Sequence, residues 1–152
     1  MSAQKLGFIG LGIMGSPMAG HLLKGGHQVF VTTRSQVPED LIKAGAVACK
    51  TAADVAKQAD IIFTMVPDTP DVEKVLFGEN GISSGISKGK TVIDMSSISP
   101  ITTNEINVLT HEFKEGLHFI EYALIGTHHD RERGILCAYL STRYRSVNIV
   151  AA

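Results

Sequence analysis

A glycine pattern between a predicted strand and a predicted helix constrains this 152-residue chain more than any other feature. Gly10, Gly12 and Gly15 form the sequence Gly-x-Gly-x-x-Gly directly after the apolar run KLGFIG at 5–10. In such a turn the first glycine allows a tight bend, the second lets the backbone approach a pyrophosphate, and the third lets helix and strand pack closely. The N–H groups that open the helix favour an anion. The pattern predicts a dinucleotide-binding turn; the alternative is a glycine turn that binds nothing.

Short apolar segments alternate with helical patterns through the first 121 residues. The predicted strands are 5–10, 27–33, 46–49, 60–67, 90–97 and a strand that begins at 117 within 117–125. The predicted helices are 14–24, about 38–44, a segment capped by Thr51, 70–78 and 100–115. Continuous apolar strands that alternate with helices are typical of a parallel sheet covered on both faces. We therefore expect an α/β fold with a doubly wound parallel sheet, the Rossmann dinucleotide-binding fold.

Composition excludes several other classes of protein. The net charge of −1 provides no basic field for nucleic acid. Apolar runs such as 61–66 are too short to span a bilayer, and the N-terminal segment has no signal-peptide pattern. Cys49 and Cys137 form no CxxC pair, which suits a reducing compartment. We expect a cytoplasmic protein without nucleic-acid or membrane partners.

The end of the second predicted strand indicates which dinucleotide is preferred. Sites for NAD usually have Asp or Glu about 20 residues after the glycines, where the carboxylate binds the ribose 2′-hydroxyl. This chain has Thr33 there, followed by Arg34. Thr33 removes a charge that would repel a 2′-phosphate, and Arg34 can pair with one. The cofactor is thus predicted to be NADP or NAD, with NADP favoured; alternatively, Arg34 is a solvated loop arginine.

Three segments in the same order resemble the β-hydroxyacid dehydrogenase family. They are GFIGLGIMGSPMAGHLLKGGH (7–27), DIIFTMVPDTPDVEKVLFGENGI (60–82) and GKTVIDMSSISP (89–100). The sequences of the last two segments are most similar to those of the branch that reduces tartronate semialdehyde (2-hydroxy-3-oxopropionate) to glycerate. Other members of the family act on 3-hydroxyisobutyrate or 6-phosphogluconate. The resemblance implies an NAD(P)-dependent oxidoreductase with a small-molecule substrate, and it leaves a homo-oligomer possible.

The resemblance also implies which residues contact the cofactor. Beyond the glycines and Arg34, these are Ile13, Met14, Thr33, Val66 and Ser97. All of them lie at the carboxyl ends of predicted parallel strands, where open parallel sheets bind their ligands. Ser96 and Ser97 have helix capping as an alternative role, since they precede a predicted helix.

The resemblance ends near residue 121, so we expect a dinucleotide-binding domain at 1–121 and a divergent tail at 122–152. Where the family has D-A-P-V-S-G-G, residues 121–127 read E-Y-A-L-I-G-T, and the substrate-binding Ser-Gly-Gly is absent. Lysines stop at Lys114, whereas four of the five arginines follow residue 121. The family's catalytic lysine and helical second domain have no counterpart in this sequence, so we expect no catalytic residue and an inactive chain. The alternatives are a truncated or frameshifted, non-catalytic nucleotide-binding fragment and a 3-hydroxyisobutyrate dehydrogenase-like member.

His128, His129 and Asp130 are the candidates for a metal cluster. Adjacent histidines in a strand or turn point apart, and no further spaced set of ligands follows them. We therefore expect no metal site.

Overall fold

A computed structural model describes residues 2–96, 118–125 and 137–140. The strands are β1 (Lys5–Ile9), β2 (Gln28–Thr32), β3 (Val47–Ala48), β4 (Ile61–Thr64), β5 (Thr91–Asp94), β6 (His118–Ile125) and β7 (Cys137–Leu140). The helices are α1 (Gly15–Lys24), α2 (Glu39–Lys43), α3 (Ala52–Gln58), α4 (Thr69–Phe77) and α5 (Ile82–Gly85). The helix predicted at 100–115 lies outside the described residues.

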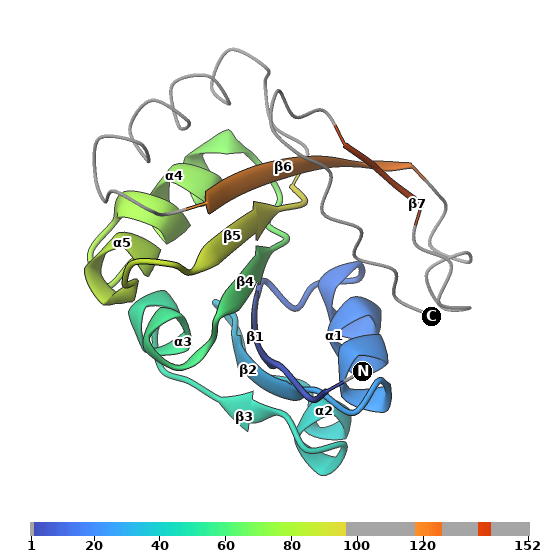
Figure 1. Ribbon diagram of the computed structural model, residues 1–152. Helices are drawn as coiled ribbons and strands as arrows, with labels where there is room; N and C mark the ends of the chain where they lie inside the picture. Colours follow the sequence, from blue (N-terminus) through green and yellow to red (C-terminus); the bar gives the residue numbers. More distant parts are fainter. Residues whose placement is uncertain (1, 97–117, 126–136, 141–152) are drawn as a thin grey trace.

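The strands form one twisted sheet in the order β3-β2-β1-β4-β5-β6-β7 (Figure 1). Neighbours from β3 to β6 are parallel, with registers such as Leu6 opposite Val29 and Leu6 opposite Ile61. The chain builds outward from β1 through β2 to β3, and then crosses back to add β4 on the other side of β1. This reversal is the topological switch point, where open α/β sheets bind their ligands. The prediction of a doubly wound parallel sheet is confirmed.

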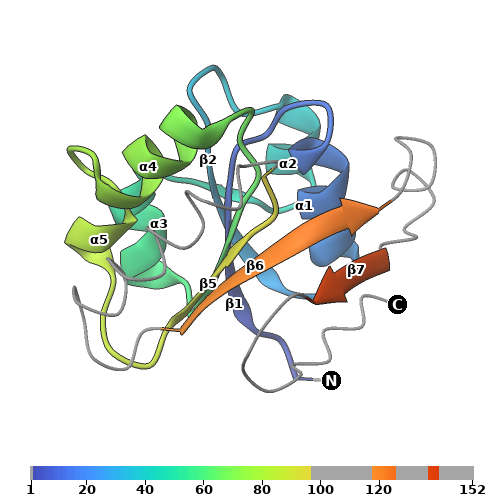
Figure 2. The same cartoon turned by 90° about the horizontal axis from the view of Figure 1, so that it is seen from above.

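Helices cover both faces of the sheet, α1 and α2 on one side and α3, α4 and α5 on the other (Figure 2). Each strand contributes apolar side chains to the cores on both faces of the sheet, because successive side chains of a strand point to opposite faces. Phe8 and Val31 pack with α1 and α2, whereas Ile9 and Phe30 pack with the other three helices. The continuous apolar runs that predicted buried strands are therefore explained by two cores.

The phenylalanines of β1 and β4 reinforce the first core beside the switch point. The ring centroids of Phe8 and Phe63 lie 6.0 Å apart, with the planes inclined by 20°. Both side chains are buried, with 1% and 7% of their surface exposed. The strands β1 and β4 are thus held together by contacts between side chains as well as by their backbone hydrogen bonds.

Two elements were not predicted from the sequence. The helix α5 is a single turn, too short to produce a helical periodicity. The strand β7 pairs antiparallel with β6, with Tyr122 opposite Leu140 and Ile125 opposite Cys137, in the segment that we expected to be a divergent tail. None of the described helices is long and apolar enough to cross a membrane.

Candidate functional site

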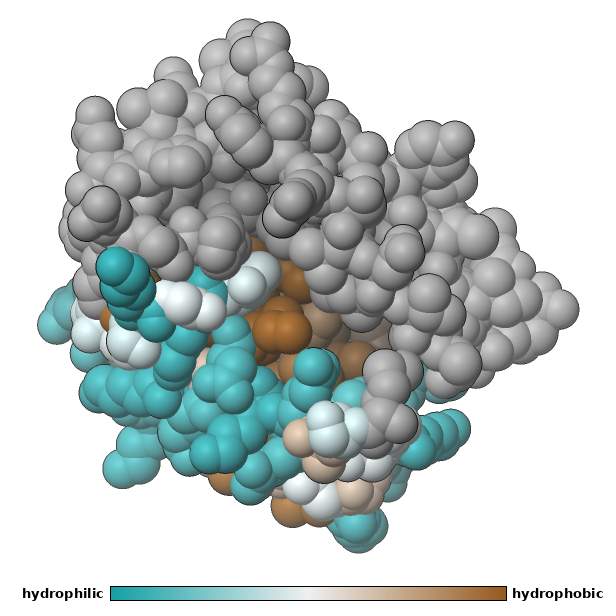
Figure 3. All heavy atoms as spheres, in the orientation of Figure 1, coloured by the Kyte–Doolittle hydropathy of each residue, from teal (hydrophilic) through white to brown (hydrophobic). Residues whose placement is uncertain are grey.

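A cavity of about 700 Å³ opens at the carboxyl ends of β1, β2 and β4. Its volume lies within the range of about 300–1,000 Å³ that is usual for small-molecule and cofactor sites. Its walls come from the glycine turn, the segment after β2, the start of α3, the turn after β4, and α4. Hydrophobic residues lie at the centre of the face seen in Figure 3, beside hydrophilic residues of the described part. The fold therefore places a pocket at its switch point.

The three glycines of the turn have different surroundings, and these match the three roles expected of them. Gly10 has a φ of +96°, and a Cβ there would overlap the carbonyl of Met65 in the neighbouring turn. A Cβ on Gly15 would overlap the carbonyl of Gly10, so the start of α1 lies directly against the turn. A Cβ on Gly12 would meet nothing within 4 Å. Gly12 therefore lines open space that a bound group can fill.

Among the described helices, the N-termini of α1, α2 and α5 have no side-chain cap, whereas those of α3 and α4 are capped. The side chain of Thr51 accepts a hydrogen bond from the N–H of Asp54, and that of Asp68 accepts one from the N–H of Asp71. No such side-chain cap exists at the start of α1, within the part of the chain that the structure describes. Helix N-termini without a cap attract anions through their N–H groups and the helix dipole. The first turn of α1, beside the open flank of Gly12, is suited to a phosphate.

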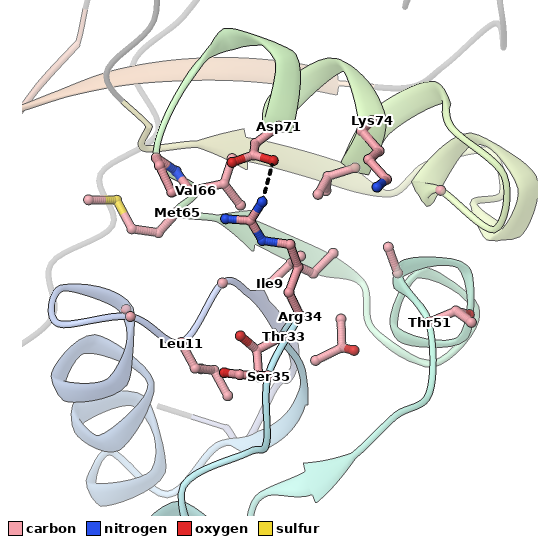
Figure 4. Close-up of a pocket in the computed structure, with 18 of the residues that line it drawn as sticks. Ile9, Leu11, Thr33, Arg34, Ser35, Thr51, Met65, Val66, Asp71 and Lys74 are labelled. Carbon is pink, nitrogen blue, oxygen red and sulfur yellow. Dashed lines mark hydrogen bonds and ion pairs between the residues drawn. The ribbon is translucent and has the colours of Figure 1, made fainter.

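Arg34 reaches across the cavity to the far wall. It follows β2, and its Nη1 lies 2.9 Å from Oδ1 of Asp71 in the first turn of α4. The side chain of Arg34 is 72% exposed and that of Asp71 is 17% exposed. Figure 4 shows the guanidinium pointing away from Thr33 and toward α4. In this structure, therefore, the candidate ligand of a 2′-phosphate is paired with a carboxylate of the chain itself.

A buried hydrogen-bond network supports the turn after β4. The N–H of Val66 donates to Oγ of Ser96 at 2.9 Å, and the Ser96 hydroxyl donates to Oδ1 of Asp94 at 2.7 Å. Thr64 Oγ1 also donates to this oxygen, at 2.6 Å. Because Val66 lines the cavity, the network connects β5 to the cavity wall. Ser96, for which helix capping was the alternative role, thus holds this wall.

Burial raises the pKa of Asp94, because a charged carboxylate loses its hydration inside the protein. Hydrogen bonds from the side chains of Thr64 and Ser96 oppose this effect, since they favour the charged form. Among the residues described, Asp94 is fully buried, and its Oδ2 has no hydrogen-bond partner. The carboxyl group is therefore held at one oxygen and desolvated at the other.

The cavity brings together all but one of the residues that the sequence predicted for the cofactor. Those that line it are Gly10, Gly12, Ile13, Met14, Gly15, Thr33, Arg34 and Val66. Ile13 is 77% exposed, which is unusual for a large apolar side chain and leaves it available to a ligand. Ser97, His128, His129 and Asp130 lie outside the described residues. In the described ranges no group of three or more His, Cys, Asp or Glu residues could hold a metal ion.

Further lining residues were missed from the sequence. Lys50 and Thr51 follow β3, and they could have been found by extending the rule about carboxyl ends to that short strand. Asp71 and Lys74 lie on α4, where no motif distinguishes them from other charged helix residues. The charged residues of the lining are thus Arg34, Lys50 and Lys74 against Asp71 and Glu79. This slight positive excess suits a ligand with several phosphates.

The residues fit a nicotinamide dinucleotide. The open flank of Gly12 and the uncapped start of α1 would accept the pyrophosphate, and Thr33 and Arg34 would face the adenosine ribose. When bound, such a cofactor supplies or accepts a hydride. The chain's own residues hold and orient it.

Comparison with known proteins also indicates a dinucleotide-binding domain. The sequence profile for the NAD binding domain of 6-phosphogluconate dehydrogenase matches residues 5–151. It continues through 122–151, where the quoted motifs had ended. A 2-hydroxy-3-oxopropionate reductase of Escherichia coli is 62% identical over 99 residues, which are 65% of this chain and 34% of that protein. A 3-sulfolactaldehyde reductase of Escherichia coli is 45% identical over 102 residues, 66% of this chain and 34% of the relative.

Solved structures share the fold. An imine reductase from Myxococcus stipitatus in complex with NADP+ superposes with a TM-score of 0.74 at 27% identity, covering 82% of this chain and 42% of that chain. The chain spans about a third of the length of the two curated relatives named above. Similarity therefore concerns the nucleotide-binding part of those enzymes.

Proposed function

The chain belongs to the family of the NAD binding domain of 6-phosphogluconate dehydrogenase, and from this premise we propose that it is the cofactor-binding domain of a reductase that converts tartronate semialdehyde to glycerate with NADPH. Relatives in this family are NAD(P)-dependent oxidoreductases of the β-hydroxyacid dehydrogenase group. The choice of NADPH and of this substrate is the proposal.

One observation carries the cofactor part of the proposal. The uncapped N-terminus of α1 and the empty flank of Gly12 lie together in the cavity at the switch point of the sheet. A pyrophosphate there would lie at the positive end of the helix dipole, beside a helix start that has no side-chain cap among the described residues.

Each lining residue then has a task in binding. Gly12 leaves room for the pyrophosphate, while Gly10 and Gly15 close the turn against Met65 and the start of α1. Val66, fixed by Ser96, would pack against the cofactor from the turn after β4. Such fixed walls matter because hydride transfer needs the donor and acceptor carbons held in a narrow range of geometries.

The preference for NADPH rests on Thr33 and Arg34. Neither residue repels a 2′-phosphate, and the guanidinium can form paired, charge-assisted hydrogen bonds with it. The proposed choice of substrate rests on the 62% identity to 2-hydroxy-3-oxopropionate reductase over 99 residues.

A second candidate function is nucleotide binding without catalysis. Its specific support is the sequence at 125–127, Ile-Gly-Thr, where the resembling family has the Ser-Gly-Gly that binds the substrate carboxylate. Isoleucine offers no hydroxyl to a carboxylate. The same site would then bind NADPH and leave the aldehyde unbound.

The test combines binding with turnover on the 152-residue chain. Titration with NADPH and NADH measures the affinity of the cavity, and loss of nicotinamide absorbance with tartronate semialdehyde measures reduction; 3-hydroxyisobutyrate, in the oxidative direction, is the comparison substrate. Binding of NADPH supports the cofactor-binding domain, and binding without reduction is the result that we expect of the 152-residue chain. Reduction in addition to binding would contradict the second candidate. A folded chain that binds neither dinucleotide contradicts both.

A further inference from the structure

The ion pair between Arg34 and Asp71 is the feature of the cavity that the proposed function does not use. The two side chains come from opposite walls, and their charged atoms meet at 2.9 Å across the cavity (Figure 4). They belong to segments separated by 37 positions in the sequence. The contact therefore depends on the tertiary fold, and any ligand near Arg34 meets both charges.

Asp71 is the fixed partner of the pair. Its N–H donates to Oδ1 of Asp68, the cap of α4, at 3.2 Å, so its backbone belongs to a capped first helical turn. Its side chain is only 17% exposed, and a carboxylate in the first turn is favoured by the helix dipole. Arg34 is the movable partner, with a long side chain that is 72% exposed.

Asp71 also has a second cation within reach of its own helix. Lys74 follows it by three positions on α4, a spacing that brings side chains together on one face, and both residues line the cavity. If Arg34 turns toward a ligand, the carboxylate thus keeps a cation nearby. Release of the guanidinium does not leave Asp71 as an isolated, partly buried charge.

We propose that Asp71 determines specificity between the two dinucleotides by competing with the ligand for the guanidinium of Arg34. This inference rests on the proposed function, because it assigns a further residue to the same cofactor site. A phosphate on the ribose carries about −1.5 to −2 charges near neutral pH and can replace a carboxylate on arginine. A ribose hydroxyl is uncharged and leaves the ion pair intact. Asp71 therefore lowers affinity for the phosphorylated ligand and has little effect on the other.

Two other roles for Asp71 predict different results. If Asp71 only repels a phosphate directly, its neutralisation strengthens binding whether or not Arg34 is present. If Asp71 orients Arg34 for binding, its neutralisation weakens binding. A double-mutant cycle separates these roles, because it measures whether the effect of one side chain requires the other.

The experiment uses adenosine 2′,5′-bisphosphate and 5′-AMP as probes, since they differ only in the 2′-phosphate. Isothermal titration at one fixed, low ionic strength compares the wild-type chain with Asp71→Asn, Arg34→Gln and the double variant. Glu73→Gln is the matched control, because Glu73 is an exposed acid of α4 that does not line the cavity.

We expect Asp71→Asn to strengthen binding of the bisphosphate by about two- to fivefold, the range of an exposed ion pair, and to leave 5′-AMP unchanged. Arg34→Gln should remove this gain, and Glu73→Gln should show none. The proposal that Asp71 competes for Arg34 would be overturned if Asp71→Asn left the affinity for the bisphosphate unchanged or weakened it. It would also be overturned if the gain in affinity persisted in the double variant, which lacks Arg34. If the folded wild-type chain binds neither probe, it is the proposed cofactor site that fails.

Discussion

The N–H of Val66 donates a 2.9 Å hydrogen bond to Oγ of Ser96, across 30 positions of sequence. Ser96 is 4% exposed, and Val66 lines the cavity at the end of β4. A buried side chain after β5 thereby fixes the backbone of a turn that forms the cofactor wall. The contact gives the serine a structural role that can be measured apart from any contact with a ligand.

Ser96→Ala should reduce both stability and cofactor affinity. The substitution leaves the part-buried N–H of Val66 without its partner, and the loss of an ordinary hydrogen bond costs about 0.5–1.5 kcal/mol. Denaturant unfolding measures the loss, and titration with NADPH measures the affinity. Ser83→Ala, on α5 and outside the cavity lining, is the control and should change neither. Wild-type stability in Ser96→Ala would mean that another group satisfies Val66.

Asp94 should make the folded chain less stable as pH rises above the ordinary carboxyl pKa. Its pKa is raised from 3.8 by burial, so the folded state binds the proton more tightly than the unfolded state. Between the unfolded and folded pKa values the folded chain therefore carries more protons, and the free energy of unfolding falls with increasing pH. At pH values above the pKa of Asp94 in the folded chain, its destabilising effect on the free energy of unfolding no longer changes with pH.

Asp94→Asn should remove this pH dependence while keeping an oxygen that accepts from Thr64 and Ser96. Unfolding of both proteins by denaturant, from about pH 4 upward, gives the difference in stability at each pH. Asp54→Asn is the opposite control: the hydrogen bond from the Thr51 side chain lowers the Asp54 pKa, so its stabilisation is lost as pH falls. Parallel profiles for wild type and Asp94→Asn would contradict the assignment.

Gly12→Val should abolish dinucleotide binding without unfolding the chain. The positive-φ glycines in the described residues do not include Gly12, and a Cβ there meets no atom within 4 Å, so the backbone tolerates a side chain. The valine would instead fill the space of the pyrophosphate. We expect at least about a tenfold loss of NADPH affinity, or 1.4 kcal/mol.

Gly20→Ala is the control for that variant, since its Cβ would lie 3.7 Å from Leu41, an ordinary contact. It should bind NADPH normally. Unchanged binding in Gly12→Val would move the phosphate site away from the glycine turn.

Arg34→Asp should reverse the preference between the two dinucleotides. It replaces a cation with a carboxylate directly after Thr33, which stands where NAD sites carry an acid. A hydrogen bond to a charged group contributes about 1.5–3 kcal/mol, so NADPH affinity should fall by about ten- to a hundredfold. Titration of both cofactors measures the change. If their ratio is the same in wild type and variant, Arg34 is a solvated loop residue.

The 152-residue chain should bind NADPH and fail to reduce tartronate semialdehyde at an enzymatic rate. Ile125-Gly126-Thr127 stands where the resembling family binds the substrate carboxylate. Orientation of reactants can contribute about 7–11 kcal/mol to catalysis, and a substrate without its clamp loses much of it. Steady-state assays of the monodisperse chain test this. Turnover near the median enzyme value of about 10 per second would show that another group holds the substrate.

The parallel sheet could be predicted from the amino-acid sequence, because alternation of apolar strands with helices is a local pattern. The glycine turn could be predicted as well, since strand, glycines and helix are contiguous. The resemblance then implied Thr33 and Val66 as cofactor contacts, and the charge of Arg34 made it a candidate for binding a 2′-phosphate. The structure brings all three into one cavity.

The contacts between distant residues in this cavity became known from the folded structure. Nothing near Arg34 in the sequence indicates that its guanidinium contacts Asp71, and nothing in the run after β5 indicates that Ser96 holds Val66. The pairing of β7 with β6 could not be predicted either, because a strand of four residues is too short for its sequence to indicate its partner. Local propensity and periodicity determine elements, whereas contacts between elements depend on where the whole chain places each side chain.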